Sequence, residues 1–341
     1  MKPGDFDYDL PPGRIAETPV TPRDAARLLV LGEEREDRRV ADLPALLRPG
    51  DLLVVNDTRV RKARLFGRRA TGGRVELLLL RPEPGGAWEA LVRANKRVRP
   101  GESVDVDGGA RATLVERPGG GAVWRVRFDA GDMDELLERA GHVPLPPYIK
   151  RDDTPVDEER YQTIFAREPG AAAAPTAGLH FTPDLLARLR ERGVDVAAVT
   201  LHVGYGTFQP VEAERVEDWR LHAEEFEVTE EAAARIAGRR GRLVAVGTTT
   251  TRVLETLAAT GGIRAASGRT DLFLHPGRRL RAVEGLLTNF HLPRSSLLML
   301  VCAFGGTARV LDAYRHAVAA GYRFYSYGDA MLVWPGASDP A

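Results

Sequence analysis

The chain has 341 residues, with 48 basic and 48 acidic side chains, so its formal net charge is zero. Hydrophobic residues make up 43% of the sequence, which is enough for a large core and excludes wholesale disorder. No apolar run reaches the ~18–20 residues of a membrane span, and the single cysteine, Cys302, excludes an internal disulfide and a cysteine zinc site. The acidic, proline-rich N-terminus is not typical of a signal peptide, so we expect a cytoplasmic protein that does not contact membranes.

The first elements along the chain are expected to be helical. Residues 21–50 predict two helical pieces: Thr21-Pro22 resembles a helix start, and Ala25–Leu31 follows until Gly32. A strand over Asp51–Val55 comes next and runs into the polar segment that begins at Asn56.

The pattern of predicted secondary structure changes in residues 61–151. Short β-rich runs, broken by Gly and Pro at roughly ten-residue spacing, end near Asp129 and predict a small antiparallel barrel. A short helix over Asp132–Arg139 and a proline-rich exit segment follow. Because residues 1–60 and 152–341 both show a mixture of predicted helices and strands, the sequence predicts a large α/β domain with an inserted small antiparallel β-barrel domain.

The inserted barrel is basic although the whole chain is neutral. Residues 59–99 contain twelve Lys and Arg against three Glu, a net charge of about +9. Such a region favours a polyanionic partner, and the alternative is an ordinary solvated surface in an arginine-rich chain. The candidate nucleic-acid contacts are Arg59, Arg61, Lys62, Lys96, Arg97, Lys150 and Arg151.

Helices and strands alternate after residue 151. Thr182-Pro183 is typical of a helix start and Gly193 of a helix end. We expect helices over Asp184–Arg192, Glu230–Arg239 and Val253–Ala259, a further helix after HLPRSS, and strands over Val194–Val203, Leu243–Val246, Leu286–Asn289, Tyr322–Tyr327 and Met331–Trp334.

Three turns in this region share one design, in which an extended segment passes through a tight polar turn into a helix start. They read APTAGLHFTP, VGTTTTR and TNFHLPRSS. Helix N-termini bind carboxylate or phosphate through free N–H groups, although Ser and Thr before a helix often only cap it. The turns therefore indicate an anion-binding site, with plain capping as the alternative.

Four histidines, His180, His202, His222 and His291, lie near such turns. Their spacing matches no HExxH or HxH pattern, which argues against a metal site. The segment LHVGYGTFQPV is no dinucleotide fingerprint, since it lacks a third glycine and a following helix. The histidines suit proton transfer near neutral pH, or they are buried hydrogen-bonding groups.

Ordered sequence blocks along nearly the whole chain resemble one family. They include DFDYDLP, NDTRV, PLPPYIKR, AAPTAGLHFT, TLHVGYGTF, VGTTTTR, LLTNFHLPRSSLLMLV and SYGDAML. These blocks are similar to the S-adenosylmethionine:tRNA ribosyltransferase-isomerase family of the queuosine pathway. One departure is Ser295-Ser296, where Ser-Thr is expected, and it keeps the hydroxyl.

The resemblance implies a transferase that moves and rearranges the ribosyl part of S-adenosylmethionine onto the 7-aminomethyl-7-deazaguanine base at the tRNA wobble position. The product would be epoxyqueuosine, with adenine and methionine released. It implies no metal or redox cofactor, since S-adenosylmethionine is consumed as a substrate, and we expect a monomer. Our candidate catalytic residues are His180, His291 and His202. The candidate substrate-binding residues are Thr176, Gly178, Gly204, Tyr205, Gly206, Thr248, Thr249, Arg252, Asn289, Phe290 and Asp329.

Two other functions remain open at this point. A tRNA methyltransferase would also use S-adenosylmethionine, but no glycine-rich nucleotide loop follows a first strand. A non-catalytic RNA-binding protein would explain the basic barrel and leave the three polar turns without a role.

Overall fold

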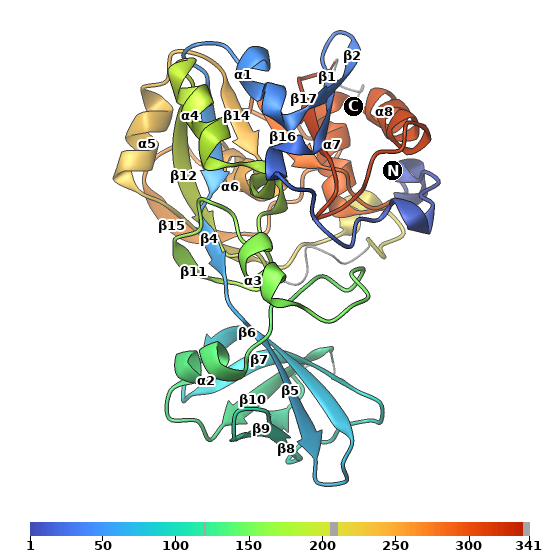
Figure 1. Cartoon of the computed structure of the whole chain (residues 1–341), viewed down its shortest axis with the longest axis vertical. Coiled ribbons are helices and arrows are strands. Elements are labelled where there is room, and N and C mark those ends of the chain that lie inside the picture. Colours follow the sequence, from blue (N-terminus) through green and yellow to red (C-terminus); the bar gives the residue numbers. More distant parts are fainter. Residues whose placement is uncertain (119–120, 205–210, 337–341) are drawn as a thin grey trace.

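The computed structural model of the chain describes residues 1–118, 121–204 and 211–336. A large domain built on a nine-stranded sheet lies above a smaller closed barrel, and two chain crossings connect them (Figure 1). The predicted fold class, an α/β domain with an inserted antiparallel β-barrel, is confirmed.

The large sheet joins strands from both ends of the chain. In spatial order its strands are β15 (Ala266–Thr270), β13 (Glu224–Val228), β12 (Asp195–Leu201), β3 (Leu52–Asn56), β14 (Leu243–Val246), β16 (Gly285–Asn289), β17 (Ala330–Val333), β1 (Arg27–Leu31) and β2 (Arg35–Arg39). The neighbours β12, β3, β14 and β16 are parallel, and β1 pairs in parallel with β17. Since β1 and β3 precede the barrel, while their parallel partners β17, β12 and β14 follow it, the barrel interrupts one domain.

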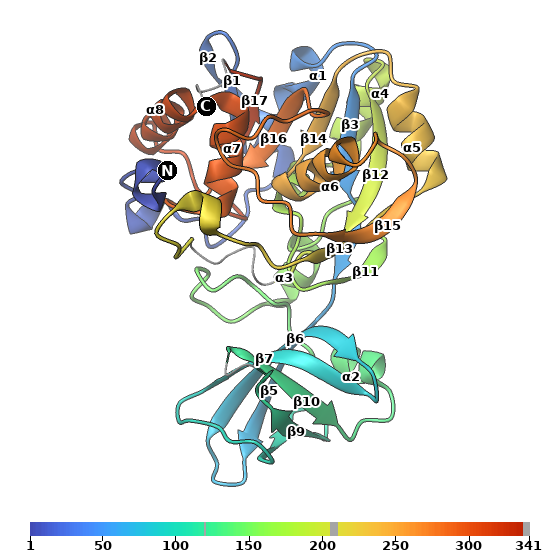
Figure 2. The ribbon, with the colours of Figure 1, turned by 180° about the vertical axis from the view of Figure 1, so that it is seen from behind.

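Helices cover both faces of this sheet (Figure 2). Alternate residues of β3 point to opposite faces, so Leu52 and Val54 join one core cluster, whereas Leu53 and Val55 join the other. The first cluster includes side chains of α5 (Glu230–Ala237), α6 (Thr248–Ala259), α7 (Ser296–Gly305) and α8 (Thr307–Ala319). The second includes side chains of α1 (Leu43–Leu46) and α4 (Pro183–Glu191).

The inserted domain is a closed antiparallel barrel. Its strands are β5 (Arg64–Arg69), β6 (Arg74–Glu83), β7 (Ala87–Ala94), β8 (Ser103–Val106), β9 (Ala110–Glu116) and β10 (Val123–Phe128). Helix α2 (Met133–Ala140) follows, capped by the Asp132 carboxylate, and places Leu136 and Leu137 in the barrel core. At Gly67 a Cβ atom would lie 2.6 Å from the Asp105 carbonyl oxygen, so β5 and β8 approach closely there because the residue is glycine.

The two chain crossings between the domains meet at an isolated antiparallel bridge between Arg64 and His142. Strand β4 (Thr58–Val60) leads toward the barrel and pairs in parallel with β11 (Glu168–Ala171), which follows α3 (Pro155–Arg160) after the chain has returned to the large domain. The exit segment 143–149 packs with the large domain, where Val143 and Leu145 join a cluster around Tyr161. Helix α2 is the last element that packs in the barrel core. It ends about ten residues before residue 151, where the sequence had predicted the domain boundary.

The prediction of helices in residues 21–50 is wrong for most of its length. Arg27–Leu31 forms the buried strand β1 between β17 and β2, and only α1 and short 3₁₀ helices lie nearby. Local propensity of Ala and Leu favours helix, but pairing with a strand some 300 residues away decides the outcome.

Two further predictions need correction near the site. Tyr322–Tyr327 forms no strand; Phe324 makes one isolated bridge to Ile15, and Tyr325 has a positive φ of 74°. Helix α6 begins at Thr248, not Val253, and within its first turn the hydroxyls of Thr250 and Thr251 bond back to the carbonyls of Val246 and Gly247. The other predicted helices and strands lie within a few residues of their predicted bounds, whereas β13, β15 and α8 were not among the predicted elements.

In the described part of the chain, no single helix is long and apolar enough to cross a membrane. Of the described helices, only α7 and α8 taken together, bent by 117° at the break between them, have the length and apolar composition of a membrane span.

Candidate functional site

The four parallel strands of the large sheet end at one edge, and polar turns follow them. Asn56 ends β3, His202 follows β12, Gly247 follows β14 and Asn289 ends β16. Ligands of open parallel sheets bind outside the carboxyl ends of the strands. The topology therefore brings the predicted turns together at the usual ligand-binding edge.

A cavity of about 60 Å³, here called the small cavity, lies at this edge. Its walls contain the starts of α6 and α7 and the 3₁₀ helix Thr176–His180, so all three predicted turns contribute. The lining side chains include Thr176, Thr248, Thr249, Asn289, Phe290, His291, Tyr148 and Tyr325.

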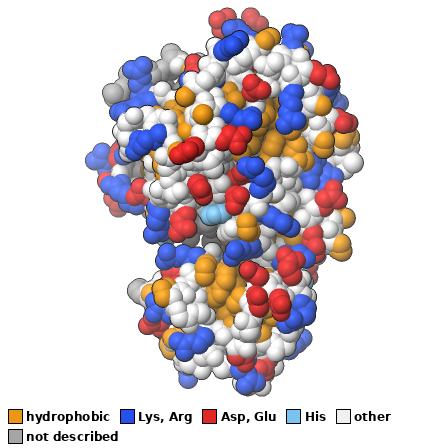
Figure 3. Space-filling model, turned by 90° about the vertical axis from the view of Figure 1, so that its left-hand side faces the viewer, with side chains coloured by type: hydrophobic (Ala, Val, Ile, Leu, Met, Phe, Trp, Pro, Cys, Tyr) orange, Lys and Arg blue, Asp and Glu red, His pale blue; other side chains and the backbone are white. Residues whose placement is uncertain are grey.

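A second cavity of about 720 Å³, here called the interdomain cavity, lies between the large domain and the barrel. Val203 and Leu297 line both cavities, so the two adjoin. The large domain contributes His202, Gly204, His222, Glu224 and Arg252, and the barrel side contributes mostly apolar residues, with the ion pair of Arg81 and Glu89. Figure 3 shows the crevice between the domains, with hydrophobic side chains on the barrel below it and both basic and acidic side chains around it.

Asn289 connects two of the predicted turns. Its Oδ1 accepts a hydrogen bond from the Thr176 hydroxyl at 3.1 Å, and its Nδ2 lies 3.1 Å from both His180 Nε2 and the Tyr325 carbonyl oxygen. His180 is 4% exposed and is not among the described residues that line the small or the interdomain cavity. Burial, helped by the charges of Arg323 and Arg23, lowers the His180 pKa to about 4, so the ring is neutral at pH 7. These contacts make His180 a support for Asn289.

His291 lines the small cavity directly. Its Nε2 lies 2.8 Å from the Thr288 hydroxyl, its backbone N–H donates to the Tyr314 hydroxyl and its carbonyl accepts from Tyr8. Burial lowers the His291 pKa to about 3. One ring contact and two backbone contacts thus hold His291 in place, and the ring is uncharged at neutral pH.

His202 lies on the wall of the interdomain cavity, next to the crossing strands. Its Nδ1 is 2.8 Å from the Thr58 hydroxyl, and a Cβ atom on Gly170 would lie 2.7 Å from its ring. Burial lowers its pKa, while the nearby carboxylates Glu225 and Asp57 act in the opposite direction. Of the three candidate histidines, His202 alone lines the larger cavity.

Arg252 is buried at 4% exposure, and protein groups occupy its guanidinium. Nη1 pairs with Glu224, Nε donates to the Leu272 carbonyl at 3.0 Å, and Nη2 donates to the Thr270 carbonyl at 3.1 Å. Glu224 in turn accepts the Gly204 N–H at 2.7 Å. Arg252 therefore fixes the end of the β12 segment and the cavity wall, where substrate contact had been predicted.

The remaining candidate substrate residues fall into different places. Phe290 lines the small cavity and packs in an aromatic cluster with Tyr314 and Phe324. Gly178 faces Thr163, and the Asp329 carboxylate accepts the backbone N–H groups of Arg27 and Arg323; neither residue lines the two cavities. Tyr205 and Gly206 lie outside the described residues.

The candidate tRNA-binding residues include both exposed side chains and side chains that pair with carboxylates. Arg59, Lys96, Arg97 and Lys150 are exposed, and Arg61 lines the interdomain cavity. Lys62 pairs with Glu158 at 2.9 Å, and Arg151 makes a two-pronged pair with the buried Asp157 at 2.7 and 2.8 Å. Arg151 therefore has a structural partner, whereas the four exposed residues face solvent.

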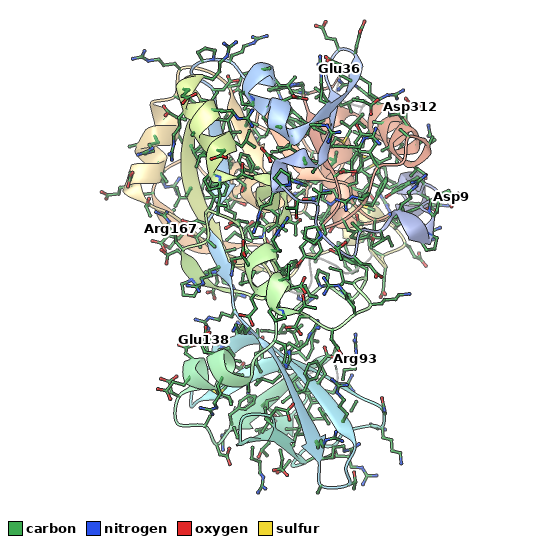
Figure 4. The ribbon with its side chains drawn as sticks, viewed as in Figure 1. Asp9, Glu36, Arg93, Glu138, Arg167 and Asp312 are labelled. Carbon is green, nitrogen blue, oxygen red and sulfur yellow. The ribbon has the colours of Figure 1, made fainter. Side chains whose placement is uncertain are left out.

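Lys96 and Arg97 line a barrel groove of about 390 Å³ together with Arg93, Arg117 and Trp124. Figure 4 labels Arg93 on the barrel at the edge that faces the large domain, with Glu138 on α2 at the opposite side. Within the described lining of this groove, the only acidic residue is Glu76. The groove has the positive charge that a phosphate backbone requires.

Sequence reasoning missed Tyr325, Tyr148 and Asn56. Tyr325 and Tyr148 line the small cavity with rings 4.1 Å apart, and they come from segments that had been assigned to a strand and to a barrel exit. Asn56 fixes the end of β3: its side-chain amide bonds both the N–H and the carbonyl of Leu201. The NDTRV block was a signal for Asn56, but nothing local distinguishes the two tyrosines.

Among the described residues, no group of three or more His, Cys, Asp or Glu is arranged to bind a metal ion.

The family model of the queuosine biosynthesis protein matches residues 4–333. The chain is 57% identical to the S-adenosylmethionine:tRNA ribosyltransferase-isomerase of Anaeromyxobacter sp. (strain Fw109-5), covering 98% of this chain and 99% of that protein. It is 54% identical to the Moorella thermoacetica protein of the same name, covering 98% and 100%.

A solved structure is also similar, the S-adenosylmethionine tRNA ribosyltransferase of Thermotoga maritima. It is 37% identical, with a TM-score of 0.55, and the match covers 96% of this chain and 99% of the other. The chain therefore belongs to the queuosine biosynthesis protein family, whose members here are S-adenosylmethionine:tRNA ribosyltransferase-isomerases.

Proposed function

We propose that this protein transfers the ribosyl part of S-adenosylmethionine to the 7-aminomethyl-7-deazaguanine base at the tRNA wobble position and isomerises it to epoxyqueuosine. Adenine and methionine leave. The observation that carries this proposal is the 57% identity to a named S-adenosylmethionine:tRNA ribosyltransferase-isomerase over almost the full length of both chains.

The two adjoining cavities support this reaction. Chemistry on a tRNA base requires the base to leave its stack and enter a pocket. The interdomain cavity, at about 720 Å³, has room for a nucleoside and an extruded base together, and ligand pockets commonly measure roughly 300–1,000 Å³. Because both domains line it, a tRNA bound along the barrel would deliver its base to the edge of the large sheet.

The reaction needs a base that removes a proton from the carbon beside the sulfonium, and an acid that protonates the departing adenine. We assign the first role to His202. When the Thr58 hydroxyl donates to the Glu168 carbonyl, His202 Nδ1–H donates to Thr58, and Nε2 retains the lone pair that a base uses. His291 is our candidate for contact with the leaving group, and His180 for holding Asn289 in place.

The tRNA contacts that we propose are the exposed basic residues Arg59, Lys96, Arg97 and Lys150, with Arg61 in the cavity wall. Phosphate contacts supply most of the sequence-independent affinity for nucleic acid. S-adenosylmethionine acts as a consumed substrate without a further cofactor. We propose a monomer that acts on tRNA in the cytoplasm.

Nucleoside mass spectrometry tests this function. The protein is incubated with S-adenosylmethionine and tRNA bearing the aminomethyl-deazaguanine base, and the tRNA is digested. Epoxyqueuosine should replace the precursor nucleoside. A methylated nucleoside would instead support a methyltransferase, and an unchanged precursor in the presence of tight tRNA binding would support a non-catalytic binding protein.

A further inference from the structure

The start of helix α6 is buried in the wall of the small cavity, and no described side chain caps it. The residue before the helix is Gly247, and Thr248 and Thr249 at its first positions are each 6% exposed. The first N–H groups of a helix have no partner within it, and the helix dipole adds partial positive charge there. The buried start of this 12-residue helix is therefore suited to a negatively charged group.

A second observation in the same cavity is independent of the helix. Tyr325 is 7% exposed and lines the small cavity, and its hydroxyl has no hydrogen-bond partner among the described residues. Buried hydroxyl groups are almost always hydrogen-bonded, so this one indicates a missing acceptor or donor. Burial raises the pKa of Tyr325, so its hydroxyl keeps its proton and can donate.

The backbone holds the Tyr325 ring in this position. Tyr325 has a φ of 74°, which a bulky residue seldom adopts. Its N–H donates to the Phe290 carbonyl at 3.1 Å, and its own carbonyl accepts from Asn289 at 3.1 Å. The Tyr148 ring packs against it at 4.1 Å. The unusual conformation is thus maintained by the turn that also carries His291.

The sizes of the two cavities decide which part of S-adenosylmethionine fits where. At about 60 Å³ the small cavity has space for a few non-hydrogen atoms, since one water needs roughly 10–15 Å³ by the same measure. The adjoining interdomain cavity is more than ten times larger. A nucleoside fits only the larger cavity, and a small terminal group fits the smaller one.

We propose that the small cavity binds the amino-acid end of S-adenosylmethionine, with the carboxylate accepting hydrogen bonds from the N–H groups of Thr248 and Thr249 and from the Tyr325 hydroxyl. This inference rests on the proposed function, which supplies the ligand. The sulfonium and the adenosine part then extend past Val203 and Leu297 into the interdomain cavity, where the extruded base meets them.

The test compares two ligands and the variant Tyr325→Phe. Calorimetry measures the affinity for S-adenosylmethionine and for its decarboxylated analogue, with an unmodified tRNA transcript present so that no reaction occurs. Tyr325→Phe should weaken S-adenosylmethionine binding about 10- to 100-fold, the range for removing a hydrogen bond to a charged group. The analogue should bind both proteins equally. The melting temperature should not fall, because the change removes only an unpaired buried hydroxyl.

A matched control is Tyr322→Phe. The Tyr322 hydroxyl donates to Asp37 at 2.5 Å, outside the cavity, so this variant should lose stability and keep its affinity for S-adenosylmethionine. Equal affinity of wild type and Tyr325→Phe for S-adenosylmethionine would overturn the inference while leaving the proposed function intact. An equal loss with the decarboxylated analogue would overturn the carboxylate assignment. Failure of the wild type to bind S-adenosylmethionine would remove the proposed function and this inference together.

Discussion

The ion pair between Arg252 and Glu224 permits a quantitative prediction about the wall of the interdomain cavity. Arg252→Met keeps an apolar stem of similar length but removes every guanidinium hydrogen bond. Glu224, at 7% exposure, would then be a buried carboxylate without its cation, and the carbonyls of Thr270 and Leu272 would lose their donors.

Removing one partner of a buried ion pair typically costs about 3–5 kcal/mol. For a domain of this size, each kcal/mol lowers the melting temperature by roughly 2 °C, so the expected drop is roughly 6–10 °C. Thermal unfolding followed by circular dichroism measures it. The control is Arg264→Met. Arg264 is exposed, and its hydrogen bonds within the described chain go to the nearby carbonyls of Thr260 and Gly262, so this variant should melt within about 1 °C of the wild type, since surface changes rarely exceed about 0.5 kcal/mol.

The double variant Arg252→Met, Glu224→Leu gives a second measurement. Because it removes the buried carboxylate together with the guanidinium that pairs with it, it should be less destabilised than the sum of its single changes. A wild-type melting temperature for Arg252→Met, together with a raised KM for S-adenosylmethionine, would refute this reasoning and make Arg252 a substrate contact.

Three further predictions follow from the site and the barrel. Replacing Lys96 and Arg97 together by Gln should weaken tRNA binding and reduce the salt slope by roughly 0.7–0.9 for each phosphate that the barrel no longer neutralises; an unchanged slope would mean that the barrel groove is only a solvated surface. His202→Gln should lower turnover about 10²- to 10⁴-fold with little change in melting temperature, and near-normal turnover would exclude His202 as the base. Because the pKa values of His180 and His291 are lowered to about 4 and 3, from 6.5, both bind protons on unfolding in acid. Stability should therefore be complete above about pH 6.5 and fall as the pH drops toward 4, by up to ~1.4 kcal/mol per pH unit for each histidine; His180→Gln should flatten this slope in denaturant titrations, and an unchanged slope would contradict the buried neutral ring.

Local sequence patterns predicted those parts of the fold that depend on near neighbours. Gly and Pro between short β-rich runs marked the barrel strands, and Thr182 and Ser295 cap the helices that their motifs indicated. Strand β1 was missed because its partner β17 lies some 300 residues away, and a five-residue run rich in Leu fits either a helix or a strand.

The sequence predicted which residues gather around the small cavity better than it predicted what each side chain contacts. Thr176, Thr248, Thr249, Asn289 and His291 meet there, as their shared turn design implied. Substrate contact by Arg252, which lines the interdomain cavity, stays a prediction, but its buried partner Glu224, 28 residues away, could not be identified from the sequence. Tyr325 could not be found at all, since nothing in YRFYSYG indicates which tyrosine adopts a positive φ.

The release of adenine from S-adenosylmethionine tests the proposed reaction most directly. Adenine and methionine should appear in equal amounts, in step with loss of the aminomethyl-deazaguanine nucleoside, and only when tRNA carrying that base is present. Formation of S-adenosylhomocysteine, or adenine release that does not depend on the modified tRNA, would contradict the proposed reaction.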